Sequence, residues 1–467
     1  MNTHTSLGRR IVAALGAAAI GLVGLAGAAN ADDHTTTTDT GNIDFSQLRS
    51  IVVHKYSQPD HPGSPATGEE QSPGDGAEAI DGVTFEACKV LNLGAGDTDN
   101  WQKVNTATVN EQGQVTIDGE VVDVAAAGCE TKVTANGGVA TFNDLAAALY
   151  VVTETGPGLN PIAEKSAPFL VTVPMPNATK TDWLYTVHAY PKNVLVGQPT
   201  KTVDDSGAHI DGDVVTWTIT ATVPNLIADK PLTELAVADI LDPRLTLVDE
   251  DDAVTVTVNG HPFDDFTLDV TKPFKVSFKT PSDFESGEVI VVTVRTKVNF
   301  PADTETGKIS NTATLIVNDA KVPSAPAVTD WGTLKVSKTD AQSSSPLSGA
   351  EFNVCLDQEC NSRVTTFTSG DGGNASLALK AGTYYLVETK APAGYTLDST
   401  PRQVVVDSGT AAAARVERIT NTKQSVPALP LTGANGQLLA LIGGGALVLL
   451  AGGTALVARK RSHQKQD

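Results

Sequence analysis

Lysine, a carboxylic acid and asparagine can react with one another when they are buried side by side, and this sequence places all three among apolar residues. In a strand, alternate side chains point to the same face. By this rule Lys338 shares the apolar face of GTLKVSKTD, Glu388 that of TYYLVETK and Asn421 that of RITNTK. We therefore expect an amine, an acid and an amide to point into one core.

The preceding stretch of the chain repeats this arrangement with an aspartate as the acid. Asn311 lies on the apolar face of KISNTATLIV, and Asp239 lies on that of ELAVADIL. Lys201 precedes both and has the same parity as Val203. In both segments the lysine comes early, on the first strand, and the asparagine comes on a late strand.

Burial would allow these groups to react. Desolvation disfavours charged forms, so it lowers the pKa of a lysine and raises the pKa of a carboxyl group. A neutral amine can attack the amide carbon of asparagine while a protonated acid polarises the carbonyl and shuttles protons. The products would be ammonia and a Lys–Asn isopeptide bond. For any one of these residues a buried ion pair is the ordinary alternative, but the same order of residues in two segments favours the reaction.

Strand signals dominate the elements that must position these residues. Runs rich in β-branched or aromatic residues, bounded by Gly, Pro or Asp, occur at 254–258, 289–298, 313–317, 384–389 and 402–407. Short strands of this kind indicate an all-β protein made of tandem Ig-like β-sandwich domains. We expect one short helical exception, DLAAAL at 144–149.

The chain of 467 residues is long enough for several domains. The segments 42–195 and 331–424 share the order of a lysine-bearing strand, a Gly-x-x-Phe strand and an aromatic-x-Val-x-Glu strand. This shared order predicts related folds. The predicted divisions are a signal peptide at 1–31, globular segments at 42–195, 196–330 and 331–424, and a sorting region at 429–467.

Both ends of the chain have the composition of targeting segments. Arg9 and Arg10 precede an apolar stretch, and Ala-Asn-Ala at 29–31 supplies the small-x-small pattern of a signal-peptide cleavage site. The uncharged run 438–457 would reach roughly 30 Å as a transmembrane helix. Basic residues at 459–461 follow it and should stay cytoplasmic, so the body of the chain is exported.

Composition and cysteine usage narrow the possible partners. The net charge of −21 argues against nucleic acid or anionic lipid as a partner. Four cysteines in an exported chain favour disulfides, and among three possible connectivities we predict Cys88–Cys129 and Cys355–Cys360, because each pair lies within one segment. Without histidines at ligand spacing, a phosphate-binding loop or a nucleophile motif, the sequence indicates no metal, no cofactor and no enzyme.

These residues resemble a known family. VSKTD, LSGAEF, YLVETKAPAGY and ITNT closely resemble the collagen-adhesin B-type domains of Gram-positive surface proteins, and VADILDPRL with KISNTATL resembles the related A-type isopeptide-forming domain. The resemblance implies bonds Lys338–Asn421, assisted by Glu388, and Lys201–Asn311, assisted by Asp239. Asp242 in the ILDPR turn is the alternative to Asp239.

LPLTG, formed by Leu429, Pro430, Leu431, Thr432 and Gly433, directly precedes the apolar run and the basic tail. This three-part pattern resembles a sortase sorting signal. The resemblance implies that a sortase thiolate cleaves between Thr432 and Gly433 and keeps the threonine as an acyl-enzyme. The membrane segment would then be a transient tether of a precursor that ends covalently anchored to peptidoglycan.

WLYTVHAYPKN at 183–193 resembles the pilin motif of sortase-assembled major (backbone, or shaft) pilins, and YLVETKAPAGY resembles their E-box. The resemblance implies a fimbrial shaft in which a pilus-specific sortase joins Thr432 to Lys192 of the next identical subunit. Tip and base pilins and support of adhesion are implied as well, while no residue pattern indicates a host receptor. A monomeric cell-wall-anchored adhesin is the alternative.

Strand parity separates the last two residues of this stretch. Lys192 falls on its more polar face, open to an enzyme, whereas Asn193 falls on the face of Trp183 and Val187. Asn193 then becomes a candidate for a third intramolecular bond, to Lys55 with Glu154 as the acid. The sequence leaves open whether this third bond forms.

Overall fold

The computed structural model describes residues 42–425, apart from residues 60, 62, 125–127, 272 and 302–304. The predicted signal peptide, the LPLTG motif and the apolar run 438–457 lie outside the described residues. Among the described residues, no helix is long and apolar enough to cross a membrane.

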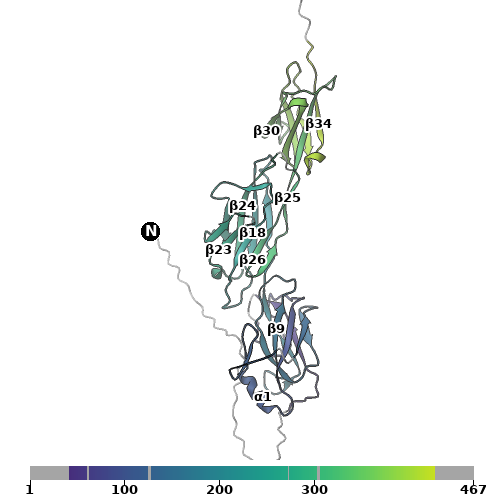
Figure 1. Ribbon diagram of the computed structural model, residues 1–467. Coiled ribbons are helices and arrows are strands. Elements are labelled where there is room, and N and C mark those ends of the chain that lie inside the picture. Colours follow the sequence, from purple (N-terminus) through teal and green to yellow (C-terminus); the bar gives the residue numbers. More distant parts are fainter. Residues whose placement is uncertain are drawn as a thin grey trace, which may run out of the picture. The chain divides into compact units, whose positions relative to one another are not determined.

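Strands are the predominant secondary structure of the described chain and helices are few, which confirms the all-β prediction (Figure 1). The strands before residue 196 are β1 (Ser50–His54), β2 (Tyr56–Ser57), β3 (Thr84–Asn92), β4 (Thr108–Val109), β5 (Val115–Ile117), β6 (Glu120–Val122), β7 (Cys129–Val133), β8 (Val139–Phe142), β9 (Ala148–Gly156), β10 (Ile162–Glu164), β11 (Phe169–Val173), β12 (Met175–Pro176), β13 (Trp183–Leu184), β14 (Thr186–Ala189) and β15 (Lys192–Leu195).

The rest of the described chain is equally rich in strands. From residue 196 to residue 323 the strands are β16 (Thr200–Asp204), β17 (Val214–Thr222), β18 (Leu235–Asp239), β19 (Leu245–Leu247), β20 (Val254–Val258), β21 (His261–Pro262), β22 (Phe266–Asp269), β23 (Phe274–Phe278), β24 (Val289–Val298), β25 (Lys308–Asn311), β26 (Ala313–Val317) and β27 (Ala320–Pro323). The later strands are β28 (Ala327–Asp340), β29 (Glu351–Cys355), β30 (Arg363–Thr368), β31 (Asn374–Lys380), β32 (Gly382–Lys390), β33 (Arg402–Val406) and β34 (Val416–Asn421).

Helical structure is short wherever the chain is described. It consists of α1 (Thr98–Lys103) and the 3-10 turns Val104–Thr106, Pro281–Asp283, Asp371–Gly373 and Ala411–Ala413. The helix expected for DLAAAL is wrong, because Ala148 and Leu149 instead begin β9, which pairs with both β3 and β11. Pairing on two sides within a sheet outweighs the local helix preference of alanine and leucine.

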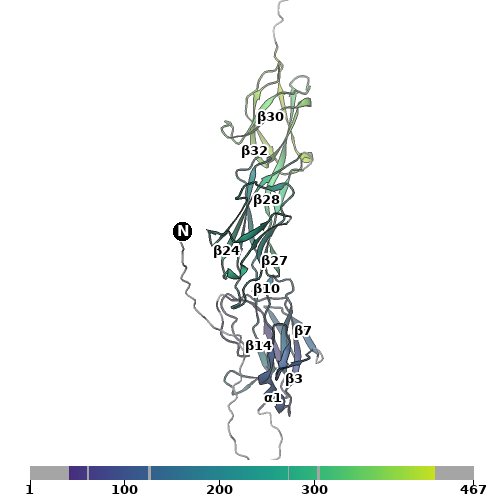
Figure 2. The ribbon, with the colours of Figure 1, turned by 60° about the vertical axis from the view of Figure 1, so that its left-hand side comes forward.

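Strands before residue 196 pair only with one another in the described sheets. The largest of these sheets has the order β11-β9-β3-β7, and smaller sheets have the orders β14-β1-β8 and β10-β15-β2. Figure 2 shows β3, β7 and β14 in this part of the chain. Ile51, Val53, Phe85 and Phe142 form the centre of its core and are fully buried.

Strands β16 to β24 and β26 to β27 form two sheets that cover a second core. One sheet has the order β16-β17-β24-β20-β21, with β19 also on β24, and the other has the order β22-β23-β18-β26-β27. Trp217, Val292 and Leu315 are buried between them. This is the layering of a β-sandwich, in which alternate residues of each strand point into the core.

The described chain divides into two compact units, with the main boundary at Gly332 inside the long strand β28. Residues 378–380 and 408–411 also belong to the first unit. β28 pairs with β25 through residues 327–330 and with β34 through residues 335–340. In the second unit the other sheet has the order β30-β29-β32-β33. The division of the first unit into segments 42–195 and 196–330 stays a prediction.

Candidate functional site

Lys338, Glu388 and Asn421 meet in the core of the second unit. They lie on β28, β32 and β34, and their exposed fractions are 0%, 2% and 2%. Lys338 Nζ is 3.0 Å from Glu388 Oε1, and Asn421 Nδ2 donates to Glu388 Oε2 at 2.8 Å. The ion pair is short but poorly aligned, so Lys338 Nζ and Glu388 Oε1 form no hydrogen bond within the described structure. Amine and amide therefore both lie within contact distance of the acid in one core.

Another cluster of the same composition forms before residue 196 and is the first cluster along the chain; the cluster of Lys338 is the last. Lys55 lies between β1 and β2, Glu154 lies on β9 and Asn193 lies on β15, and all three are buried. Lys55 Nζ is 2.9 Å from Glu154 Oε2 and also contacts Asn193 Oδ1. Asn193 Nδ2 donates to Glu154 Oε1 at 2.8 Å. The residues of the third predicted bond are thus brought together, with the acid bridging amine and amide.

The middle cluster along the chain joins Lys201 on β16, Asp239 at the end of β18 and Asn311 at the end of β25. All three are buried. Lys201 Nζ contacts Asp239 Oδ2, and Asn311 Nδ2 donates to the same oxygen at 3.3 Å. The alternative acid, Asp242, instead forms an ion pair with Arg244 at 2.8 Å. The geometry therefore favours Asp239 as the acid.

Strand register explains why the lysine meets the asparagine in two of these clusters. β28 and β34 are parallel with Asp340 opposite Asn421, and β2 and β15 are parallel with Ser57 opposite Asn193. In each case the lysine lies two residues before the residue that pairs with the asparagine. Side chains two residues apart share a face, so the amine and amide are diagonal neighbours inside the core. The same register in both segments agrees with their related sequences.

Burial shifts the pKa values in the direction that the reaction requires. It lowers the pKa of the Lys55 amine to about 8, although the Glu154 carboxylate opposes the shift. Burial likewise lowers the pKa of Lys201 and Lys338 and raises that of Asp239, each opposed by its ion-pair partner. Aromatic rings of Phe85, Trp217 and Phe352 lie 5.4 to 5.6 Å from the three amines and exclude water. A lowered pKa favours the neutral form of an amine, which is the form that can act as a nucleophile.

The pKa of Lys55 predicts a pH-dependent reaction in the first cluster. With a pKa of about 8, the neutral amine rises from roughly a tenth of the population at pH 7 to roughly nine tenths at pH 9. We expect the Lys55–Asn193 bond to form roughly tenfold faster at pH 9 in a chain refolded from unreacted, unfolded material. Mass spectrometry of peptides sampled over time measures the rate, with tryptophan fluorescence as a control for folding. A rate that is flat or falls over this range would contradict the prediction.

Neighbouring residues Lys192 and Asn193 lie on opposite faces of β15. Asn193 is fully buried in the cluster, whereas Lys192 is half-buried at the surface. Lys192 Nζ donates to the carbonyl oxygen of Pro73 at 2.7 Å and lies 4.9 Å from the centre of the Tyr56 ring. Burial lowers the pKa of this amine. Sequence reasoning missed the contacts of Lys192 with Tyr56 and Pro73. Alternation along β15 says nothing about the neighbouring strand or about the loop that reaches the lysine.

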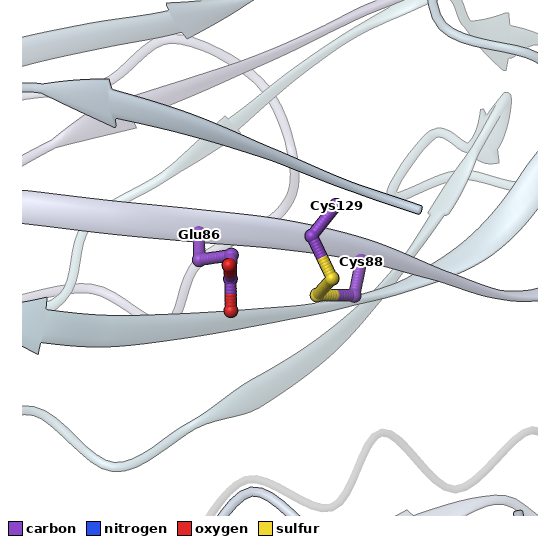
Figure 3. A group of neighbouring side chains, drawn as sticks. All are labelled: Glu86, Cys88 and Cys129. Atoms are coloured by element: carbon purple, nitrogen blue, oxygen red, sulfur yellow. A yellow bond between two sulfur atoms is a disulfide. The ribbon is translucent and has the colours of Figure 1, made fainter. Parts of the chain in front are cut away.

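The four cysteines form the two predicted disulfides, Cys88–Cys129 and Cys355–Cys360. The first joins directly opposed residues of β3 and β7. Figure 3 shows Glu86 beside this bridge. A carboxylate oxygen of Glu86 and the two sulfur atoms lie within 4.8 Å of one another, a spacing that a metal ion could bridge. Sulfur atoms that are bonded to each other are not thiolates, so these three residues are not a metal site.

Comparison with known proteins places the chain in a family. Three family models match it: the Gram-positive pilin subunit D1 N-terminal domain at residues 30–194, a prealbumin-like fold domain at 332–419, and the LPXTG cell wall anchor motif at 421–463. Fimbrial subunit type 2 of Actinomyces naeslundii is 32% identical, covering 99% of this chain and 98% of its own length. The chain belongs to the family of Gram-positive fimbrial subunits.

Further relatives agree with this assignment. Fimbrial subunit type 1 of Actinomyces viscosus is 28% identical over 99% of both chains. The full-length major pilin SpaD of Corynebacterium diphtheriae has a TM-score of 0.65 and 26% identity, covering 83% of this chain and all of its own. The major pilin SpaA of the same organism has a TM-score of 0.53 and 22% identity, covering 80% of this chain and all of its own, and shows the same fold. This pilin is a structural subunit of a surface pilus anchored to the cell wall.

Proposed function

We propose that this pilin forms the shaft of the pilus through a bond between Thr432 of one subunit and Lys192 of the next. The observation that supports this most directly is the different exposure of two adjacent side chains on β15. Asn193 is buried beside Lys55, while the adjacent Lys192 keeps its amine at the surface with a lowered pKa. A nucleophilic amine at a fixed surface position is what an acyl-enzyme needs as an acceptor.

The proposed linkage balances without any cofactor. A sortase thiolate attacks the carbonyl carbon of Thr432, forms a thioester and releases the segment that begins at Gly433. The neutral amine of Lys192 then attacks the thioester, forms an amide with Thr432 and regenerates the thiolate. The last subunit of a polymer would instead be transferred to an amine of peptidoglycan. We propose tip and base pilins as further partners of the shaft.

The three buried clusters are proposed to form isopeptide bonds within each subunit, without an external enzyme. In each cluster the lysine Nζ attacks the asparagine Cγ, the bond from Cγ to Nδ2 breaks, and the acid transfers a lysine proton to the leaving ammonia. Lys55–Asn193 and Lys338–Asn421 each join two parallel strands near the start and the end of their segment. Tension along the chain would then pass through covalent bonds, which suits a fibre that supports adhesion under shear.

Purified pili test the proposed linkage at the level of atoms. Proteolysis should yield a branched peptide in which the carbonyl of Thr432 is joined to Nζ of Lys192, identified by its mass and fragmentation. Lys165 and Lys180, which are exposed in the same segment, serve as internal comparisons. A branch carried on either of these lysines, or on no lysine of the chain, would contradict the proposal.

A further inference from the structure

Ser166 contacts two of the three residues of the first cluster, the amide Asn193 and the acid Glu154. It belongs to the short loop between β10 and β11. β10 pairs with β15, which holds Asn193, and β11 pairs with β9, which holds Glu154. The loop from β10 to β11 therefore runs from the strand beside Asn193 to the strand beside Glu154. The topology therefore places Ser166 at the reacting groups although it is distant from Lys55 in the sequence.

Ser166 makes hydrogen bonds to both groups. Its backbone N–H donates to Asn193 Oδ1 at 2.8 Å and more weakly to Glu154 Oε2 at 3.4 Å. Its hydroxyl donates to Glu154 Oε2 at 2.8 Å. The other carboxylate oxygen, Oε1, remains on Asn193 Nδ2. Glu154 is thus held with one oxygen toward Lys55 and one toward the nitrogen that must leave.

We infer that Ser166 assists formation of the Lys55–Asn193 bond, an inference that rests on the isopeptide bond proposed above. When Lys55 Nζ attacks Asn193 Cγ, negative charge develops on Oδ1. The Ser166 N–H already points at this oxygen and stabilises the charge as an oxyanion-hole donor does. Its hydroxyl acts as a positioning group, because it fixes Glu154 to take the proton from Nζ and deliver it to Nδ2. Ammonia leaves, and no other reactant is needed.

The other two clusters lack this feature in the described part of the chain. Asn311 Oδ1 and Asn421 Oδ1 are buried without a hydrogen-bond partner. In the last cluster a backbone N–H, that of Asp398, donates to the acid Glu388 at 3.1 Å and not to the amide. Within the described residues, only the first of the three clusters therefore has a backbone N–H that donates to the amide oxygen. The other two clusters serve as internal controls when Ser166 is changed.

The test follows the rates of all three bonds in one molecule. Full-length chains with Ser166→Ala, Ser166→Thr or Ser166→Pro are refolded from unreacted material, and mass spectrometry of peptides measures ammonia loss at each asparagine. We expect Ser166→Ala to slow Lys55–Asn193 formation roughly tenfold, by freeing Glu154 and loosening the loop. Ser166→Pro, which removes the N–H, should slow it roughly a hundredfold. Ser166→Thr keeps both donors and should react near the wild-type rate.

The Lys201–Asn311 and Lys338–Asn421 bonds should form at unchanged rates in every variant. Once its first bond is complete, Ser166→Ala should unfold at the wild-type temperature, which a merely structural role would not predict. A wild-type rate for Ser166→Ala would overturn the positioning role of the hydroxyl, and a wild-type rate for a folded Ser166→Pro chain would overturn the role of the backbone N–H. A wild-type chain that never forms Lys55–Asn193 would contradict the proposed bond itself and this inference with it.

Discussion

Replacing Lys192 by alanine is expected to abolish the covalent polymer. Cells that produce wild-type pilin should show a ladder of high-mass species that survives boiling in detergent, and the Lys192→Ala strain should show only the monomer anchored to the wall. Without an amine at this position, the acyl-enzyme has no acceptor on the next subunit. Immunoblotting of wall extracts measures the result.

Two further substitutions sharpen this experiment. Lys192→Arg should also abolish the ladder, because a guanidinium stays protonated and is a poor nucleophile. Lys180→Ala removes an exposed lysine from the same segment and should leave the ladder intact. The soluble Lys192→Ala protein should keep its three internal bonds, since Lys192 is not part of the buried cluster. A ladder that persists without Lys192 would contradict the assignment of Lys192 as the acceptor and favour another lysine. A ladder absent from wild-type cells would contradict covalent linkage of the subunits.

Replacing Glu388 by glutamine is expected to remove one internal bond and no other. Glutamine preserves the shape of the side chain but cannot accept the proton of Lys338, so ammonia cannot leave from Asn421. After allowance for the four hydrogens lost in the two disulfides, the intact mass of the wild-type chain should fall short of the mass of the same residues by three ammonia molecules, and that of Glu388→Gln by two. Peptide mapping should locate the missing bond at Lys338 and Asn421.

Loss of this bond should also reduce stability. By analogy with loop closure by a disulfide, a cross-link of this span restricts the unfolded chain by about 4 to 5 kcal/mol. A double variant, Lys338→Met with Glu388→Leu, removes both charges together with the bond and separates the effect of the cross-link from that of an unpaired buried amine.

Glu351→Gln is the matched control on the neighbouring strand β29, because Glu351 forms only an exposed ion pair with Lys390. It should keep all three bonds and unfold within about 1 kcal/mol of wild type. An unchanged mass deficit in Glu388→Gln would contradict the assigned role of the acid.

Much of the candidate site could be predicted from alternation along single strands. The pattern around Lys338, Glu388 and Asn421 required each side chain to face a core, and all three are buried. The predicted strand runs at 254–258, 289–298 and 313–317 agree with β20, β24 and β26 residue for residue. Side-chain direction has a period of two within a strand, so it can be read from the neighbouring residues alone.

Two questions could not be answered from one segment alone: which aspartate is the acid of the middle cluster, and whether DLAAAL is a helix. Contacts from distant segments decided both. Asp239 and Asp242 differ by three positions, and only the pairing of β18 with β26 and the nearby Arg244 separates them. The expected helix at DLAAAL failed for the same reason, because the sheet around β9 decided its conformation.

The sequence by itself determined which residue types of this pilin lie in the cores and which strands contain the amines and the amides. Tertiary structure alone decided how these groups meet. The diagonal register that sets Lys55 beside Asn193, the loop that aims Ser166 at the amide, and the cover of Lys192 by Pro73 each depend on pairings across many residues. Local alternation specifies where a side chain points, whereas its partners follow from the register of whole sheets.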